Sequence, residues 1–76
     1  MNVSSLVVQT KSESVNTVIE LIKKCDFCDY HLHDEKGRIV VTIDANEKDE
    51  ELDKFDKIKM IPNVISVSLM YSYSED

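Results

Sequence analysis

Four residues whose side chains can bind zinc lie within nine consecutive positions: Cys25, Cys28, His31 and His33. A Cys-x-x-Cys pair at a helix end can hold a zinc ion, and two histidines at alternate positions would share one side of a strand. The usual structural zinc pattern, however, separates its two ligand pairs by a longer loop. The alternative is that Cys25 packs at a helix end, Cys28 lies in a loop and both histidines lie on an edge strand. We favour this alternative and expect no metal ion or other cofactor, while a zinc or redox module stays open.

No other group of residues has the spacing of a catalytic site. The chain contains one glycine, so it lacks a Gly-rich phosphate-binding loop. No set of nucleophile, base and orienting residue can be recognised from spacing. We therefore expect a binding protein and not an enzyme.

The composition indicates a small soluble protein with an acidic surface. The 76 residues carry a formal net charge of −6, with 42% hydrophobic and 32% charged residues. This length fits one domain over residues 1–76, and the negative charge disfavours a nucleic-acid partner, whose phosphates require Lys and Arg. The sequence shows neither a signal peptide nor an apolar run that could span a membrane. We expect a cytoplasmic protein with reduced cysteines that does not insert into the membrane.

The first half of the chain predicts a strand, a helix and a hairpin. Residues 6–8 form a short, β-branched apolar run that is typical of a buried strand. Residues 15–22 carry apolar side chains at i, i+3, i+4 and i+7, which predicts an amphipathic helix. Strands over residues 30–34 and 38–44 would then form a hairpin.

The second half predicts a helix followed by a long strand. Asn46 can cap the helix, and Leu52 and Phe55 would be buried against the sheet. The last strand runs from Val64 to about Tyr73. The order β-α-β-β-α-β predicts an α+β, ferredoxin-like fold, with a four-stranded antiparallel sheet in strand order 4-1-3-2 and both helices on one face.

Such a fold leaves the other face of the sheet open. Alternation predicts that Ile65, Val67, Leu69 and Tyr71 point toward the helices. The residues predicted to line the open face are Ser5, Val7, Gln9, Val40, Thr42, Ser66, Ser68 and Met70. They would form a platform of small and aliphatic side chains on which a helix or extended peptide could lie. The alternative is that this is only the tolerated open face of a small sheet. Aromatic residues for base stacking are missing from the central strands, which argues against RNA binding.

The run from Asp44 to Asp53 is strongly acidic, with six acidic residues in ten. Most runs of this kind are the solvated beginning of a helix. The alternative is a docking patch for a basic peptide.

Four short motifs lie in the strands and turns of this chain. They are Ser5-Leu6-Val7-Val8 in the opening strand, Gly37-Arg38-Ile39-Val40-Val41-Thr42 in the hairpin, Ile61-Pro62-Asn63-Val64, and Ser68-Leu69-Met70-Tyr71 at the close. Together these motifs resemble the NapD family of cytoplasmic chaperones for the periplasmic nitrate reductase. The resemblance spans nearly the whole chain. The family often has Gly where this chain has Asn63, a mild departure because Asn tolerates a left-handed backbone. The Cys/His segment is not a family signature.

The resemblance implies a chaperone that binds the twin-arginine signal peptide of the reductase's catalytic subunit. It would delay export until the molybdenum cofactor is inserted. The peptide would lie in helical form on the open face, with apolar side chains on Val7, Val40 and Met70. The chain's acidity would favour the arginine-bearing end. We expect a monomer that carries out no chemistry itself. A ligand-sensing domain of the ACT type uses the same fold and stays an alternative, although this glycine-poor chain lacks the Gly-rich loop such domains often carry.

Overall fold

A computed structural model describes residues 2–74 of the chain, and the side chains of residues 3–70 within that range. The elements are β1 (Asn2–Thr10), the short 3-10 helix η1 (Ser12–Ser14), α1 (Val15–Lys24), β2 (Asp29–His33), β3 (Arg38–Ala45), α2 (Lys48–Lys59) and β4 (Val64–Ser74).

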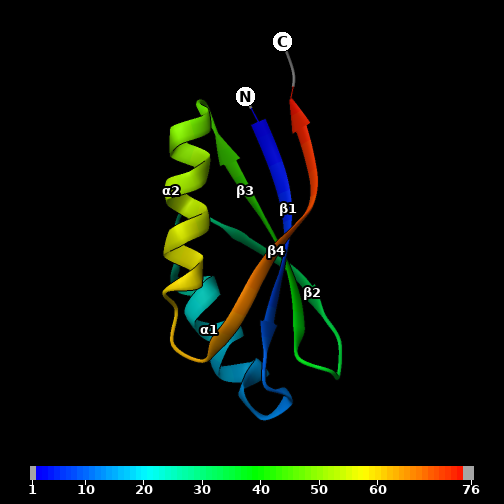
Figure 1. Cartoon of the computed structure of the whole chain (residues 1–76). Helices are drawn as coiled ribbons and strands as arrows, with labels where there is room; N and C mark the ends of the chain where they lie inside the picture. Colours follow the sequence, from blue (N-terminus) through cyan, green and yellow to red (C-terminus); the bar gives the residue numbers. More distant parts are fainter. Residues whose placement is uncertain (1, 75–76) are drawn as a thin grey trace.

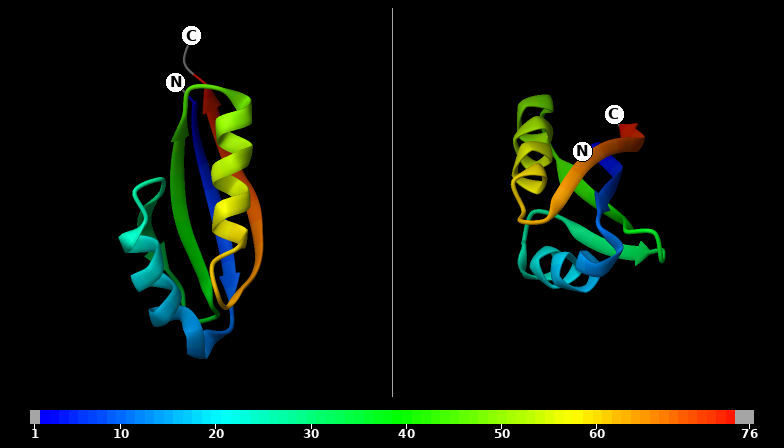
Figure 2. Two further views of the ribbon diagram at one scale, coloured as in Figure 1. Left: turned by 90° about the vertical axis from the view of Figure 1, so that its left-hand side faces the viewer. Right: turned by 60° about the horizontal axis from the view of Figure 1, so that its bottom comes forward.

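The strands form one antiparallel sheet in the order β2-β3-β1-β4. Both helices lie on the same face of this sheet, α1 over β2 and β3, and α2 over β3 and β4 (Figures 1 and 2). The predicted ferredoxin-like fold and its strand order are therefore confirmed. Within residues 2–74, neither helix is long and apolar enough to cross a membrane.

The core lies between the sheet and the helices and is anchored by β1. The apolar run of β1 resolves into strict alternation, because Leu6 and Val8 are fully buried whereas Val7 is only half-buried. Val18 and Ile22 of α1, also fully buried, pack into the same cluster. The apolar side chains at positions i, i+3, i+4 and i+7 of α1 thus pack against the alternate, inward-facing residues of the central strands.

The helix α2 is rotated relative to the prediction. Ile58 is fully buried and Phe55 is half-buried, but Leu52 is 53% exposed, so the predicted burial of Leu52 is wrong. The reason is geometric: residues 52 and 58 lie about 120° apart around a helix with 3.6 residues per turn, so one sheet cannot bury both. The predicted cap is also different. The backbone N–H of Asn46 donates to the Glu50 carboxylate at 3.2 Å, and the helix itself begins after Glu47.

Two turns depend on left-handed backbone. Gly37 has φ +87°, and a Cβ at this position would overlap the Thr10 carbonyl oxygen. Thr10 in turn donates its N–H to the Gly37 carbonyl at 2.7 Å, which ties the β2–β3 hairpin to the end of β1. Asn63, between α2 and β4, has φ +73°. Asn is one of the few residues besides Gly that adopt this left-handed conformation at small cost.

Candidate functional site

The face of the sheet opposite the helices is built from alternate residues of all the strands. In the β1–β3 ladder, Ser5 pairs with Thr42 and Val7 with Val40. Residues opposite each other in such a ladder point to the same face, and Val7 must point away from the helices because Leu6 and Val8 point toward them. On the other side of β1, Val7 pairs with Ser68 and Gln9 with Ser66. The register therefore brings seven of the predicted residues onto one face: Ser5, Val7, Gln9, Val40, Thr42, Ser66 and Ser68.

An apolar row crosses the middle of this open face. Leu32 of β2 pairs with Val40, which pairs with Val7. Leu32 is 58% exposed, and the two valines are half-buried. Leu32 is not among the residues predicted for this face, because simple alternation along β2 does not place it here. Beyond Val7 the row continues into Ser68, whose small side chain lets another backbone approach closely.

Gln9 lies at the hairpin end of the open face and has a structural role. Its side-chain amide donates to the carbonyl of Thr10 at 2.9 Å. The same nitrogen lies 3.2 Å from the Lys36 carbonyl and 3.3 Å from the Gly37 carbonyl. Gln9 therefore links β1 to the β2–β3 turn and marks one limit of the face.

The strand β4 is irregular, which changes two predictions. Its register against β1 shifts at two places, and each shift leaves one extra residue in β4, Ile65 and Met70. Ile65 is 61% exposed, so its predicted position in the core is wrong. Val67 packs against the core, whereas Leu69 is on the helix side but 55% exposed. Met70 is also 55% exposed, at a bulge instead of a regular open-face position. The side chain of Tyr71 lies outside the described part.

The two histidines do not share one side of β2. A register shift between Tyr30 and Leu32 makes His31 the extra residue of a bulge. His31 Nε2 lies 2.7 Å from Thr42 Oγ1 on the open face, whereas His33 Nδ1 lies 2.6 Å from the Tyr30 hydroxyl. Because Tyr30 pairs with the core residue Val41, His33 is on the helix side. The predicted common side of the histidines is therefore wrong.

The two cysteines are free thiols at the end of α1. Cys25 donates to the Leu21 carbonyl at 3.2 Å, and Cys28 is buried in the core cluster. Burial, followed by the neighbouring Cys25 and Asp29, raises the pKa of the Cys28 thiol to about 12. Among residues 2–74, no three His, Cys, Asp or Glu side chains are placed to hold a metal ion. The geometry thus places the two histidines on opposite sides of β2. Cys28 lies in the loop between α1 and β2, as expected, but its side chain is buried and has the character of a core residue.

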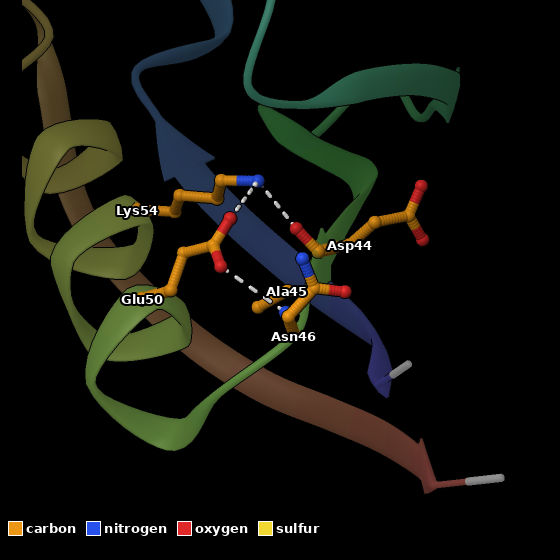
Figure 3. A pocket seen from close by; sticks show the side chains of 5 residues that line it. All are labelled: Asp44, Ala45, Asn46, Glu50 and Lys54. Carbon is orange, nitrogen blue, oxygen red and sulfur yellow. Dashed lines mark hydrogen bonds and ion pairs between the residues drawn. The ribbon is translucent and has the colours of Figure 1, made fainter.

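A polar pocket of about 220 Å³ lies at the beginning of the acidic run (Figure 3). Its lining residues are Asp44, Ala45, Asn46, Glu50 and Lys54. Lys54 Nζ lies 3.3 Å from the Glu50 carboxylate and also donates to the Asp44 carbonyl oxygen. The Asn46 N–H is the largest of the causes that lower the pKa of Glu50, followed by Lys54. These contacts fasten the first turns of α2 to the end of β3, as expected for a solvated helix start.

A second, apolar groove lies between α2 and β4, on the helix side of the molecule. It has a volume of about 220 Å³, and its lining residues are Lys48, Glu51, Leu52, Phe55 and Leu69. Its two most exposed apolar side chains, Leu52 and Leu69, resemble Leu32 in exposure. The groove therefore offers a natural comparison surface for tests of the open face.

A family model, curated relatives and a solved structure all relate this chain to the same family. The family model described as "NapD protein" matches residues 1–76. "Chaperone NapD" of Escherichia coli K12 is 27% identical over 75 residues, which cover 97% of this chain and 86% of the relative; the protein of the same name from Shigella flexneri gives the same values. The solution structure of the E. coli Tat proofreading chaperone protein NapD superposes with a TM-score of 0.83 at 27% identity, covering 97% of this chain and 79% of that one. Because the family model spans the full sequence, and the fold superposes on that of the E. coli chaperone, this chain belongs to the NapD family.

Proposed function

We propose that this protein is a cytoplasmic chaperone that binds the twin-arginine signal peptide of the catalytic subunit of a periplasmic nitrate reductase. By covering the peptide it would delay export until the molybdenum cofactor is inserted and the enzyme has folded. The names of the relatives, "Chaperone NapD" and "Tat proofreading chaperone protein NapD", support this proposal. The protein would act as a monomer.

The observation that carries the proposal is the uncovered apolar row of the open face. Leu32, Val40 and Val7 lie side by side across β2, β3 and β1, and both helices are on the other face (Figure 2). A partner that covers this row removes apolar surface from water, which is worth about 25 cal/mol for each Å².

The surroundings of the row suit a helical ligand. Ser5, Ser66 and Ser68 are small, so a helix can approach the sheet closely, and their hydroxyl groups can hydrogen-bond to polar groups at its margins. The row crosses the strands, so a helix that runs along the strands would cross the row and could contact it with apolar side chains at i, i+3 and i+4. Binding would then depend on side chains of the sheet face, with no need for a free strand edge.

Titration with synthetic leaders tests the proposal. We expect a leader with the arginine pair and its apolar segment to bind the isolated protein with a measurable heat in isothermal titration calorimetry. A second leader of equal length, with both arginines replaced by glutamine, should bind more weakly. A third, with two apolar residues replaced by aspartate, should not bind. If all three leaders bind equally, or the first does not bind, the proposed function is wrong.

A further inference from the structure

The charged residues of the open face are unequally distributed along β3. The outward residues of this strand are, in order, Arg38, Val40, Thr42 and Asp44. Asp29 of β2 pairs with Thr42 and so lies toward the Asp44 end. Along the strands, negative charge is therefore found at one end of the open face and positive charge at the other, with the apolar row between them.

The positive end is already neutralised. Arg38 Nε lies 2.6 Å from the Asp34 carboxylate, which also accepts the backbone N–H groups of Lys36 and Arg38. These contacts, the Arg38 N–H first, lower the pKa of Asp34 below its usual value. A ligand at this end meets a balanced pair of charges.

The negative end is not neutralised. Within the described part of the chain, neither Asp29 nor Asp44 forms an ion pair or a side-chain hydrogen bond. Figure 3 shows why for Asp44: its carbonyl oxygen faces Lys54, while its carboxylate points away from Lys54 and Glu50. Both carboxylates are on exposed residues and can receive a cation from a ligand.

We infer that the open face binds the leader in one direction, with its arginines at Asp29 and Asp44 and its apolar segment extending over Val40 and Val7 toward Arg38. This inference rests on the proposed function, and it names the groups that recognise the arginine pair. A helical leader in this direction also places the positive end of its macrodipole at the carboxylates and the negative end near Arg38.

The spacing along β3 gives the register. Asp44 and Val40 are four residues apart, which corresponds to about 14 Å in an antiparallel strand. A helix rises about 1.5 Å per residue, so the leader residue over Val40 should follow the arginines by about nine positions. An apolar segment that begins soon after the arginine pair satisfies this spacing, whereas the reverse direction would place the arginines beside an Arg38 that is already paired.

The test is a set of double-mutant cycles between the protein and the synthetic leader. We expect Asp44→Asn and Asp29→Asn each to weaken binding of the arginine leader by about threefold to tenfold. The same variants should bind the glutamine-substituted leader as wild type does. Asp56→Asn, which removes an exposed carboxylate from α2, controls for the change in net charge and should have no effect with either leader.

A nitroxide label at the amino end of the leader measures the direction independently of these substitutions. The label should broaden the amide signals of Asp44 and Ala45 in the NMR spectrum and spare those of Gly37 and Arg38. Broadening at Gly37 and Arg38 instead, or arginine-leader affinities of Asp29→Asn and Asp44→Asn that equal wild type, would overturn the direction while leaving the proposed function intact. Absence of binding by the wild-type protein to any leader would overturn both.

Discussion

Replacing Val40 with glutamate should strongly weaken leader binding while the protein stays folded. Val40 is the centre of the apolar row and pairs with Leu32 of β2 on one side and with Val7 of β1 on the other. A carboxylate beneath an apolar peptide side chain loses its water without gaining a partner, which costs about 1–3 kcal/mol. The dissociation constant should therefore rise by about fivefold to 150-fold.

The effect on stability should be smaller than the effect on binding. In the unbound protein Val40 is half-buried and faces solvent, so the glutamate keeps most of its hydration. The expected loss is about 1 kcal/mol in the free energy of unfolding, the range spanned by strand propensities. Urea denaturation followed by circular dichroism measures this loss, and calorimetry measures the affinity.

Two further variants separate the reasons for weaker binding. Val40→Thr keeps the branched shape but adds a hydroxyl, and should weaken binding by only about fivefold, corresponding to about 1 kcal/mol. Leu52→Glu introduces the same charge on the other side of the molecule, in the groove beside α2. Leu52 is 53% exposed, close to the 58% of Leu32 in the apolar row. It should bind the leader as wild type does. The reasoning is refuted if Val40→Glu retains full affinity, or if Leu52→Glu loses as much.

Other predictions concern the scaffold. Ile58→Ala should lower the free energy of unfolding by about 2–5 kcal/mol, because Ile58 is fully buried, whereas Leu52→Ala should cost less than about 1 kcal/mol; equal costs in urea denaturation would contradict the orientation of α2. Gly37→Ala should destabilise by about 2 kcal/mol or more, since the new Cβ meets the Thr10 carbonyl in a left-handed turn; an unchanged melting temperature would argue against this close approach. Cys28 should resist alkylation by iodoacetamide at pH 8 until the protein is unfolded. Folding raises the pKa of Cys28 from 9.0 to about 12, so the stability that the protonated thiol contributes is present below pH 9 and is lost as the pH rises toward 12. In Cys28→Ala, this part of the pH dependence of the unfolding free energy should be absent.

The fold could be predicted because local patterns and topology agree. The apolar stripe of α1 and the alternation of β3 each identify their element, and the order of the elements permits few arrangements. The central position of β1 follows from that order. A run of three apolar residues does not by itself assign faces, and it is the burial of Leu6 and Val8 under the helices that shows that Val7 points outward.

The errors have a common cause in local irregularities. Bulges at His31, Ile65 and Met70 each insert one residue, and the side chains beyond then change face relative to strict alternation. No residue type marks these bulges in the sequence, so Leu32 was missed and the two histidines were placed together. The predicted burial of Leu52 is wrong for another reason. Leu52, Phe55 and Ile58 are spaced three residues apart, so their side chains drift around the helix, and the sheet covers only the Ile58 end.

The most direct test of the central claim is an NMR titration of the isotope-labelled protein with the arginine leader. If the open face is the binding surface, the methyl signals of Leu32, Val40 and Val7 shift first and in proportion to the bound fraction. The methyl signals of Leu52 and Leu69, in the groove on the helix side, stay in place. Shifts confined to Leu52 and Leu69, with the signals of the apolar row unchanged at saturation, would contradict the account.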